Sequence, residues 1–402
     1  MQEFINFAKN YCYIHSPMKR IGILMDSIFT IGGVQRVTAV IAKELAKDYD
    51  VTIITLDYPS AKDTSLYGLE EANIHYRFFS YPKVGTAKEA ICKAYSYLYR
   101  KVLPQTQYTS ELYAHSSFPS ENRDALTAEL LQGNYDVIIG DHAPLAVRLA
   151  SCRKQLKGCK LIGWIHNSYE ALFGKDSLYI GPELSRHYEY QLAKLDATIV
   201  LSRFDAAKYP FPTYVIYNPL TLEPGKPSEG TSHKFLAVGR LSYLHKGFDL
   251  LIEAFHIFTQ KNQDWTLDIV GEGPEEAVYR QMISKYGLES RIMIHPFTKN
   301  IQKYYTEGQV YVLSSRWEGF GLVIVEAMAH GLPVVSSDLP TSKEIMDDFG
   351  LYFENGNVSQ LAQCLEEATH LNWQEKSQEA LRRKETFAVS NIIKQWKELI
   401  ES

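Results

Sequence analysis

Short apolar runs that alternate with longer amphipathic stretches constrain the fold of this chain most. Before residue 202, each of five such runs has the length of a buried strand. They are Ile21–Met25, Val51–Leu56, Val137–Gly140, Leu161–Ile165 and Thr198–Leu201. The stretches between them have helical spacing, as in residues 34–46. Strands that alternate with helices predict an α/β fold with βαβ units and a doubly wound parallel sheet.

A second series of the same kind follows a segment that predicts a linker. Residues 218–232 contain three prolines and two glycines and have no apolar period. Five more strands are predicted beyond them: Phe235–Val238, Leu267–Val270, Ile292–Ile294, Val310–Leu313 and Val334–Ser336. We therefore expect two domains, 1–217 and 218–389, with a ligand-binding cleft between them.

Composition excludes several classes of protein. With 45% hydrophobic and 22% charged residues, the chain is typical of soluble globular proteins. A net charge of −5 disfavours nucleic acid as a partner. The five cysteines form no C-x-x-C pair, so we expect no zinc site and reduced, cytoplasmic thiols. Residues 1–17 lack the pattern of a signal peptide, and the native start is either Met1 or Met18.

The loop after the first predicted strand contains a glycine pair, Gly32 and Gly33, at the start of a helix. Glycines there let backbone N–H groups approach a phosphate or a sugar. The alternative is a turn that serves packing alone. The pattern is not G-x-G-x-x-G, which disfavours a dinucleotide-dependent dehydrogenase.

The loop after Phe235–Val238 contains two cations, Arg240 and Lys246, that can face one anion. A departing pyrophosphate needs its charge neutralised by a metal or by fixed cations. None of the loops that follow strands carries a D-x-D pair for a metal. We expect no metal and no cofactor, with the two cations in the metal's place. The alternative is a solvated surface pair.

The loop after Val310–Leu313 leads into a helix and contains two carboxylates, Glu318 and Glu326. Carboxylates accept hydrogen bonds from vicinal hydroxyls, so the pair suits a ribose and a hexose. Backbone N–H groups at the helix start suit hydroxyls or phosphate; they belong to Phe320, Gly321, Leu322 and Val323. Alternatively, Glu326 caps its own helix or pairs within the core.

A histidine, His166, ends the apolar strand KLIGWI. A polar residue at that end of a strand is expected to point into the cleft. The alternative is a hydrogen-bonded core histidine.

Together these loops resemble the retaining glycosyltransferases with the GT-B fold, often called family 4. The most specific motif is EGFGLVIVEAMAHGLPVV, which contains both Glu318 and Glu326. The stretches GRL…KGFDLLIEAF and VGEGPE match the family's phosphate loop and next turn. The resemblance extends from Lys19 to about Val389 and implies two facing Rossmann-like domains, with the C-terminal helix 390–402 packed on the first.

The resemblance also implies roles for individual residues. Arg240 and Lys246 would bind the donor diphosphate and Glu326 the ribose hydroxyls. Glu318 would hold the transferred sugar, with His166 against it. The backbone at 320–323 would support sugar and phosphate, and Gly32 and Gly33 would close from the opposite domain. Phe297, in the segment HPF, falls where the family seats the nucleobase.

The implied reaction is transfer of a hexose or N-acetylhexosamine from a UDP-sugar to a hydroxyl of a glycan, lipid-linked or cell-envelope acceptor, with retention and without metal. Two alternatives of the same fold are a nucleotide-sugar epimerase and a non-catalytic subunit. Residues 83–101 form a basic amphipathic helix, whose apolar face includes Ile91 and Leu98. That helix either contacts anionic membrane at the inner face of the cell membrane or packs on its own sheet.

Overall fold

The computed structural model describes residues 18–175, 177, 179–223 and 225–402. The N-terminal segment 1–17, including the choice of native start, lies outside the described residues. The chain divides into two compact units. The first unit contains residues 1–165, 183–199 and 399–402, and the second contains 166–182 and 200–398.

A seven-stranded sheet, mainly in the first unit, has the order β3-β2-β1-β4-β5-β6-β7. Its strands are β1 (Arg20–Met25), β2 (Asp50–Thr55), β3 (Ile74–Phe78), β4 (Val137–Asp141), β5 (Lys160–Trp164), β6 (Ala197–Val200) and β7 (Tyr214–Val215). The central strand β1 pairs in parallel with both β2 and β4. Its side chains from Ile21 to Met25 are buried because helices cover both faces of the sheet.

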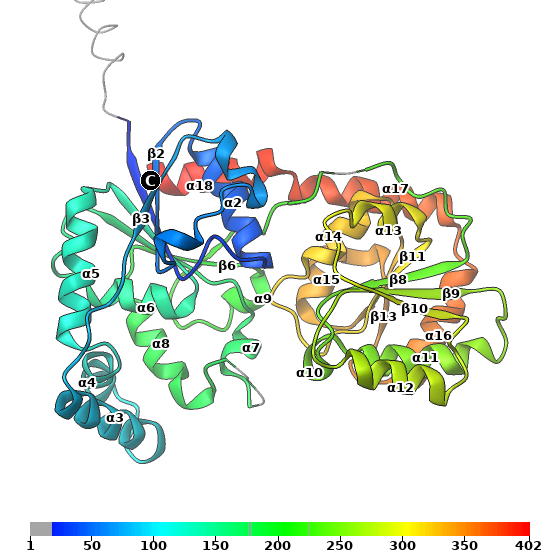
Figure 1. Cartoon of the computed structure of the whole chain (residues 1–402), viewed down its shortest axis with the longest axis horizontal. Coiled ribbons are helices and arrows are strands. Elements are labelled where there is room, and N and C mark those ends of the chain that lie inside the picture. Colours follow the sequence, from blue (N-terminus) through cyan, green and yellow to red (C-terminus); the bar gives the residue numbers. More distant parts are fainter. Residues whose placement is uncertain (1–17, 176, 178, 224) are drawn as a thin grey trace, which may run out of the picture. The chain divides into compact units, whose positions relative to one another are not determined.

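The helices up to residue 206 connect these strands and are drawn in blue to green in Figure 1. They are α2 (Gly33–Leu45), α3 (Thr86–Lys101), α4 (Gln107–Ser117), α5 (Ser120–Gly133), α6 (Ala143–Ser151), α7 (Tyr169–Phe173), α8 (Ser185–Leu192) and α9 (Arg203–Ala206), with short 3₁₀ turns at 59–61, 66–71 and 182–184. The Thr106 side chain caps α4 by accepting from the Thr109 N–H. This cap fixes the turn between α3 and α4, which lie side by side.

The second unit contains a six-stranded sheet with the order β10-β9-β8-β11-β12-β13. Its strands are β8 (Lys234–Val238), β9 (Thr266–Val270), β10 (Ile292–His295), β11 (Val310–Leu313), β12 (Val334–Ser337) and β13 (Leu351–Phe353). In both sheets the first strand of the series lies centrally and the order reverses beside it. This is the Rossmann-type arrangement, in which ligands bind at the carboxyl ends of the strands.

The helices of the second unit cover both faces of its sheet (Figure 1). They are α10 (Tyr243–Lys246), α11 (Phe248–Thr259), α12 (Glu276–Lys285), α13 (Gln302–Glu307), α14 (Leu322–Ala329), α15 (Pro340–Met346), α16 (Val358–Thr369) and α17 (Trp373–Arg383), with 3₁₀ turns at 347–349 and 384–387. The C-terminal helix α18 (Val389–Glu401) follows, and from Leu399 its residues belong to the first unit. Phe235 packs with α11, α12 and α16, whereas its neighbour Leu236 packs with α13 and α14. This alternation is the period of two expected of a strand buried on both faces.

The predicted α/β fold with two Rossmann-like parallel-sheet domains is confirmed. Three short strands, β3, β7 and β13, were not predicted, and all three lie at sheet edges. The described residues of the expected linker, 218–232, form no helix or strand. At the end of α18, the Glu401 carboxylate accepts hydrogen bonds from Lys19 at 2.7 Å and Tyr49 at 2.9 Å, within the first unit.

Candidate active site

Two loops meet at the carboxyl edge of the second sheet. One follows β8 and contains the segment from Gly239 to Gly247, and the other follows β11 and leads to α14. Because β8 and β11 are neighbours in the sheet, their carboxyl ends lie together. This is the position where parallel α/β sheets bind ligands.

A glycine lets the two loops approach closely. Gly247 has φ +62°, and a Cβ at this position would lie 2.1 Å from the Ser314 carbonyl oxygen. The Ser314 hydroxyl donates to the Lys246 carbonyl oxygen at 2.9 Å. Only a residue without a Cβ fits here, so Gly247 fixes Lys246 against the second loop.

The structure pairs Lys246 directly with Glu318. Lys246 Nζ lies 2.6 Å from Glu318 Oε1, and the Ser315 hydroxyl donates to the same oxygen at 2.6 Å. The two charged side chains are 13% and 8% exposed. Burial alone would raise the pKa of the Glu318 carboxyl, but Lys246 and Ser315 hold it below its ordinary value. Glu318 is therefore a buried carboxylate with a fixed cation.

His245, which the sequence analysis did not single out, lies beside this pair. Its Nε2 is 4.0 Å from Glu318 Oε1, and its ring stacks on Trp317 at 5.3 Å between centroids. Burial and the Lys246 charge lower the pKa of the imidazole, which favours its neutral form. The sequence signal that could have identified His245 is its position directly before Lys246.

An ion pair holds the second loop in place. The Arg316 guanidinium donates to both carboxylate oxygens of Asp249, at 2.9 and 2.6 Å. Asp249 lies in the first turn of α11. This two-point contact fixes the loop just before Glu318, because a bidentate Arg–carboxylate pair is geometrically specific.

Arg240 differs from Lys246, the other cation of this loop, in its exposure and in its partners. Its side chain is exposed, and among the residues that the structure describes it has no carboxylate within ion-pair distance. Arg240 is thus a solvent-facing cation in the loop that also contains Lys246.

The start of α14 supplies backbone donors beside Glu318. Gly321 has φ +90° and precedes the first helical residue, Leu322. The first N–H groups of a helix have no partner within it, so those of Leu322 and Val323 suit hydroxyls or phosphate. The Phe320 side chain, by contrast, is buried against Tyr217 and Phe387. Only its backbone is suited to ligand binding.

Glu326 is buried inside α14, 2% exposed. The Tyr305 hydroxyl donates to Glu326 Oε2 at 2.8 Å. His330 Nδ1 lies 2.8 Å from the Glu326 carbonyl oxygen, and the His330 ring stacks on Tyr305. The carboxylate is therefore oriented by a tyrosine that sequence spacing could not reveal.

Two further predicted residues also lie in this unit. His166 is buried, and a Cβ on Gly319 would lie 2.5 Å from the His166 carbonyl oxygen. His166 therefore contacts the turn that directly follows Glu318. Phe297 follows β10 at the same edge of the sheet, and its ring is 46% exposed. An exposed ring at that edge is available for stacking.

The predicted glycine turn lies in the first unit, after β1. The Gly32 N–H donates to the Tyr67 hydroxyl at 2.9 Å, and that hydroxyl donates to the Thr30 carbonyl oxygen at 2.9 Å. Gly33 is exposed and begins α2. Tyr67 thus stabilises the turn and accepts the hydrogen bond of the Gly32 N–H.

His142, directly after β4, has φ +90°, a backbone conformation that strains a residue with a side chain.

One D-x-D tripeptide occurs at 48–50, but Asp50 begins β2 at the amino edge and pairs with Arg20. Among the described residues, no three His, Cys, Asp or Glu side chains are grouped to hold a metal ion.

Family models match both halves of the chain. The model described as Glycosyltransferase Family 4 matches residues 31–223, and the one described as Glycosyl transferases group 1 matches residues 221–386. An uncharacterized glycosyltransferase of Haemophilus influenzae is 26% identical over 400 residues, which is 95% of this chain and all of that protein.

Two other similar proteins have a named function or a bound ligand. The lipopolysaccharide core biosynthesis mannosyltransferase LpsB of Rhizobium meliloti is 31% identical over 156 residues, 37% of this chain and 42% of that protein. A crystal structure of Anabaena HepE in complex with UDP and glucose has a TM-score of 0.71 and 20% identity, covering 95% of this chain and 99% of that one. The adjoining family models and this shared fold establish that the chain belongs to the family 4 glycosyltransferases with the GT-B fold.

Proposed function

We propose that this glycosyltransferase moves a hexose or N-acetylhexosamine from a UDP-sugar to a hydroxyl of a glycan or lipid-linked acceptor of the cell envelope. The observation that carries the proposal is the buried Lys246–Glu318 pair, with exposed Arg240 nearby, at the carboxyl edge of the second sheet. A diphosphate needs cations and a sugar needs hydroxyl acceptors, and this edge supplies both. The UDP and glucose bound to HepE support this choice of donor class.

Each end of the donor has a matching group. Arg240 and Lys246 bind the diphosphate, because they are the cations of the loop after β8. Glu326, oriented by Tyr305 at 2.8 Å, accepts hydrogen bonds from the ribose hydroxyls. Phe297 contacts the base. Glu318 and the first amides of α14 hold the hydroxyls of the transferred sugar, with His166 beside them.

The reaction proceeds with retention and without metal or cofactor. The bond between the anomeric carbon and the β-phosphate oxygen breaks, and the diphosphate leaves with the electron pair. The acceptor hydroxyl forms the new bond from the same face and gives its proton to the departing phosphate oxygen. Arg240 and Lys246 stabilise the charge that develops on that phosphate, so no enzymic nucleophile is required.

The acceptor side includes contact with an anionic membrane at its cytoplasmic face. None of the described helices is long and apolar enough to cross a bilayer. On α3, however, Ile91 is 70% exposed and Leu98 is 44% exposed, so this apolar face does not pack on the sheet. Basic residues such as Lys101 lie on the same helix. Apolar and basic groups together favour an anionic interface.

Incubation with a panel of nucleotide sugars in the presence of EDTA tests this function. The expected result is slow release of UDP and free sugar from one UDP-sugar, with the released sugar retaining its configuration when first formed. Conversion of the UDP-sugar into its epimer would show the epimerase reaction instead. Absence of nucleotide binding would contradict the site assignment.

A further inference from the structure

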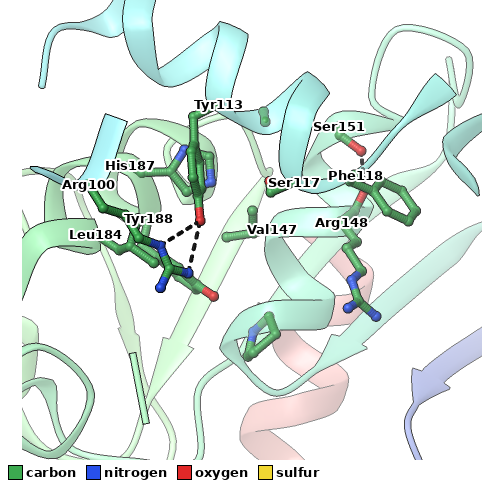
Figure 2. A pocket seen from close by; sticks show the side chains of 12 residues that line it. Arg100, Tyr113, Ser117, Phe118, Val147, Arg148, Ser151, Leu184, His187 and Tyr188 are labelled. Atoms are coloured by element: carbon green, nitrogen blue, oxygen red, sulfur yellow. Dashed lines mark hydrogen bonds between the residues drawn. The ribbon is translucent and has the colours of Figure 1, made fainter. Parts of the chain in front are cut away.

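A cavity lies within the first unit, between α3, α4, α6 and α8 (Figure 2). Its volume is about 130 Å³. The donor site proposed above uses none of its residues. One wall is α6, which begins directly after β4 and contributes lining residues from Pro144 to Ser151.

Two arginines from different helices line this cavity. Arg100 of α3 donates to the Tyr113 hydroxyl from Nε at 3.3 Å and from Nη2 at 3.1 Å. The Arg148 guanidinium of α6 lies over the rings of Tyr81 and Phe118, at 5.3 and 5.7 Å from their centroids. In the part of the chain that the structure describes, neither guanidinium has a carboxylate within ion-pair distance.

Both arginines lie close enough to one lining residue, Tyr188, to act on its phenol. Tyr188 lines the cavity, and burial raises the pKa of its phenol to about 12 while Arg148 and Arg100 oppose that rise. His187 adds no charge. Its Nδ1 lies 3.0 Å from the Ser110 hydroxyl oxygen, and burial lowers the pKa of the imidazole to about 3.

Most of the remaining lining side chains are apolar or aromatic, and the exceptions are Ser117 and Ser151. Phe118, Pro144, Val147 and Leu184 line the cavity together with the Tyr113 ring (Figure 2). Flat apolar and aromatic surfaces pack against the C–H faces of sugar rings, whereas a free inorganic anion gains nothing from them. The volume equals that of roughly four water molecules in the liquid. It accommodates an acidic group and part of the ring that carries it.

We propose that this cavity binds an acidic sugar of the acceptor, a hexose ring that bears a carboxylate or a phosphate, with Arg100 on the acidic group and Arg148 across the cavity from it (Figure 2). This inference rests on the proposed glycosyltransferase function, since it names the chemistry of the acceptor. Arginine suits this role because its planar fork binds carboxylate and phosphate oxygens in pairs. The hydrogen bonds from Arg100 to the Tyr113 hydroxyl and the two rings beside Arg148 hold the guanidiniums in position before a ligand arrives.

Ligand-observed NMR on the full-length chain tests the proposal, with UDP at saturation so that the donor site is filled. The ligands are glucuronate, glucose 6-phosphate, glucose and inorganic phosphate. We expect the two acidic sugars to bind at least tenfold more tightly than glucose or phosphate. Equal binding of phosphate and glucose 6-phosphate would overturn the sugar assignment, and equal binding of glucose would overturn the role of the arginines.

Variants separate the cavity from general surface charge. Arg100→Gln and Arg148→Gln should each weaken glucuronate binding at least tenfold. Lys101→Gln removes the same charge from the same helix outside the cavity and should leave binding unchanged. If Arg148→Gln lowers the melting temperature, Arg148→Lys, which keeps the charge, replaces it in this comparison. Unchanged glucuronate binding in Arg100→Gln would overturn the proposal.

The same experiment keeps this inference distinct from the proposed function. Wild-type protein that binds UDP but no acidic sugar contradicts the cavity assignment alone. Protein that binds acidic sugars but no UDP contradicts the donor assignment and, with it, the identification of the bound sugar as an acceptor. UDP affinity should be the same in Arg100→Gln and the wild type.

Discussion

Lys246 Nζ lies 2.6 Å from Glu318 Oε1, although the two residues are 72 positions apart in the chain. They are the groups that we assign to the two halves of the donor, phosphate and sugar. Lys246 keeps the buried Glu318 carboxylate ionised, and removal of either residue leaves a buried charge without its partner.

The first prediction concerns Lys246→Ala. Turnover should fall roughly 10²- to 10³-fold, as on loss of one preorganised donor to a developing anion. The Glu318 pKa is lowered in the wild type, so the carboxylate form persists until pH falls below the ordinary glutamate range. Without Lys246, burial dominates and the pKa of Glu318 rises. The acid limb of the pH–rate profile should therefore move to higher pH.

Lys303→Ala is the control for that measurement, because Lys303 is exposed on α13 and pairs only loosely with Glu307, at 3.8 Å. Its profile should match the wild type. An acid limb that stays in place in Lys246→Ala would show that Glu318 is not the titrating group.

The second prediction separates activity from stability at Arg240. This exposed side chain has no ion-pair partner among the described residues, so Arg240→Gln should change the free energy of unfolding by no more than about 0.5 kcal/mol. Turnover should fall roughly 10²-fold or more. Denaturant titration and steady-state kinetics measure the two effects. Arg382→Gln, exposed on α17, should alter neither.

Sequence reasoning predicted the strands that are buried on both faces and the edge strand β10, and it missed the other three edge strands. A central strand such as β1 reads as a continuous apolar run because helices cover both of its faces. The edge strand β3 has the sequence IHYRF, in which polar residues alternate with apolar ones, and β13 has only three residues, LYF. Neither pattern differs enough from a loop to be recognised without its neighbours.

The predicted site residues were chosen by their positions in loops, and the contacts between them were not predictable. The motif places Glu318 and Lys246 at strand ends, but their pairing depends on Gly247 passing against Ser314. Tyr305 orients Glu326 from another helix, a relation that has no period in the sequence. Likewise, spacing could not show that the Gly32 amide is bonded by Tyr67.

The third prediction concerns the loop contact at Gly247. Gly247→Ala combines a left-handed φ of +62° with a Cβ 2.1 Å from a carbonyl oxygen. Backbone strain of this kind costs about 1–3 kcal/mol, and the clash adds to it. Turnover should fall because Lys246 is displaced. Gly287→Ala has a similar φ, +66°, but meets nothing within 4 Å, so the difference between the two variants isolates the clash.

The fourth prediction concerns the apolar face of α3. Ile91→Ser with Leu98→Ser should abolish co-sedimentation with phosphatidylglycerol vesicles, since each buried aliphatic side chain contributes about 1.5–3 kcal/mol. Ile257→Ser, which changes an apolar residue 44% exposed on α11, is the matched control and should sediment like the wild type. Wild-type protein that stays in the supernatant with anionic vesicles contradicts the membrane contact.

Calorimetric titration of UDP into the wild type and Glu326→Gln, without added metal, tests the central claim most directly. Loss of a hydrogen bond to a charged group weakens binding by about 1.5–3 kcal/mol. We therefore expect the wild type to bind UDP and Glu326→Gln to bind it roughly 10- to 100-fold more weakly. Glu253→Gln, exposed on α11, should bind as the wild type does. No binding by the wild type, or equal binding by Glu326→Gln, would contradict the assignment of this site to the nucleotide.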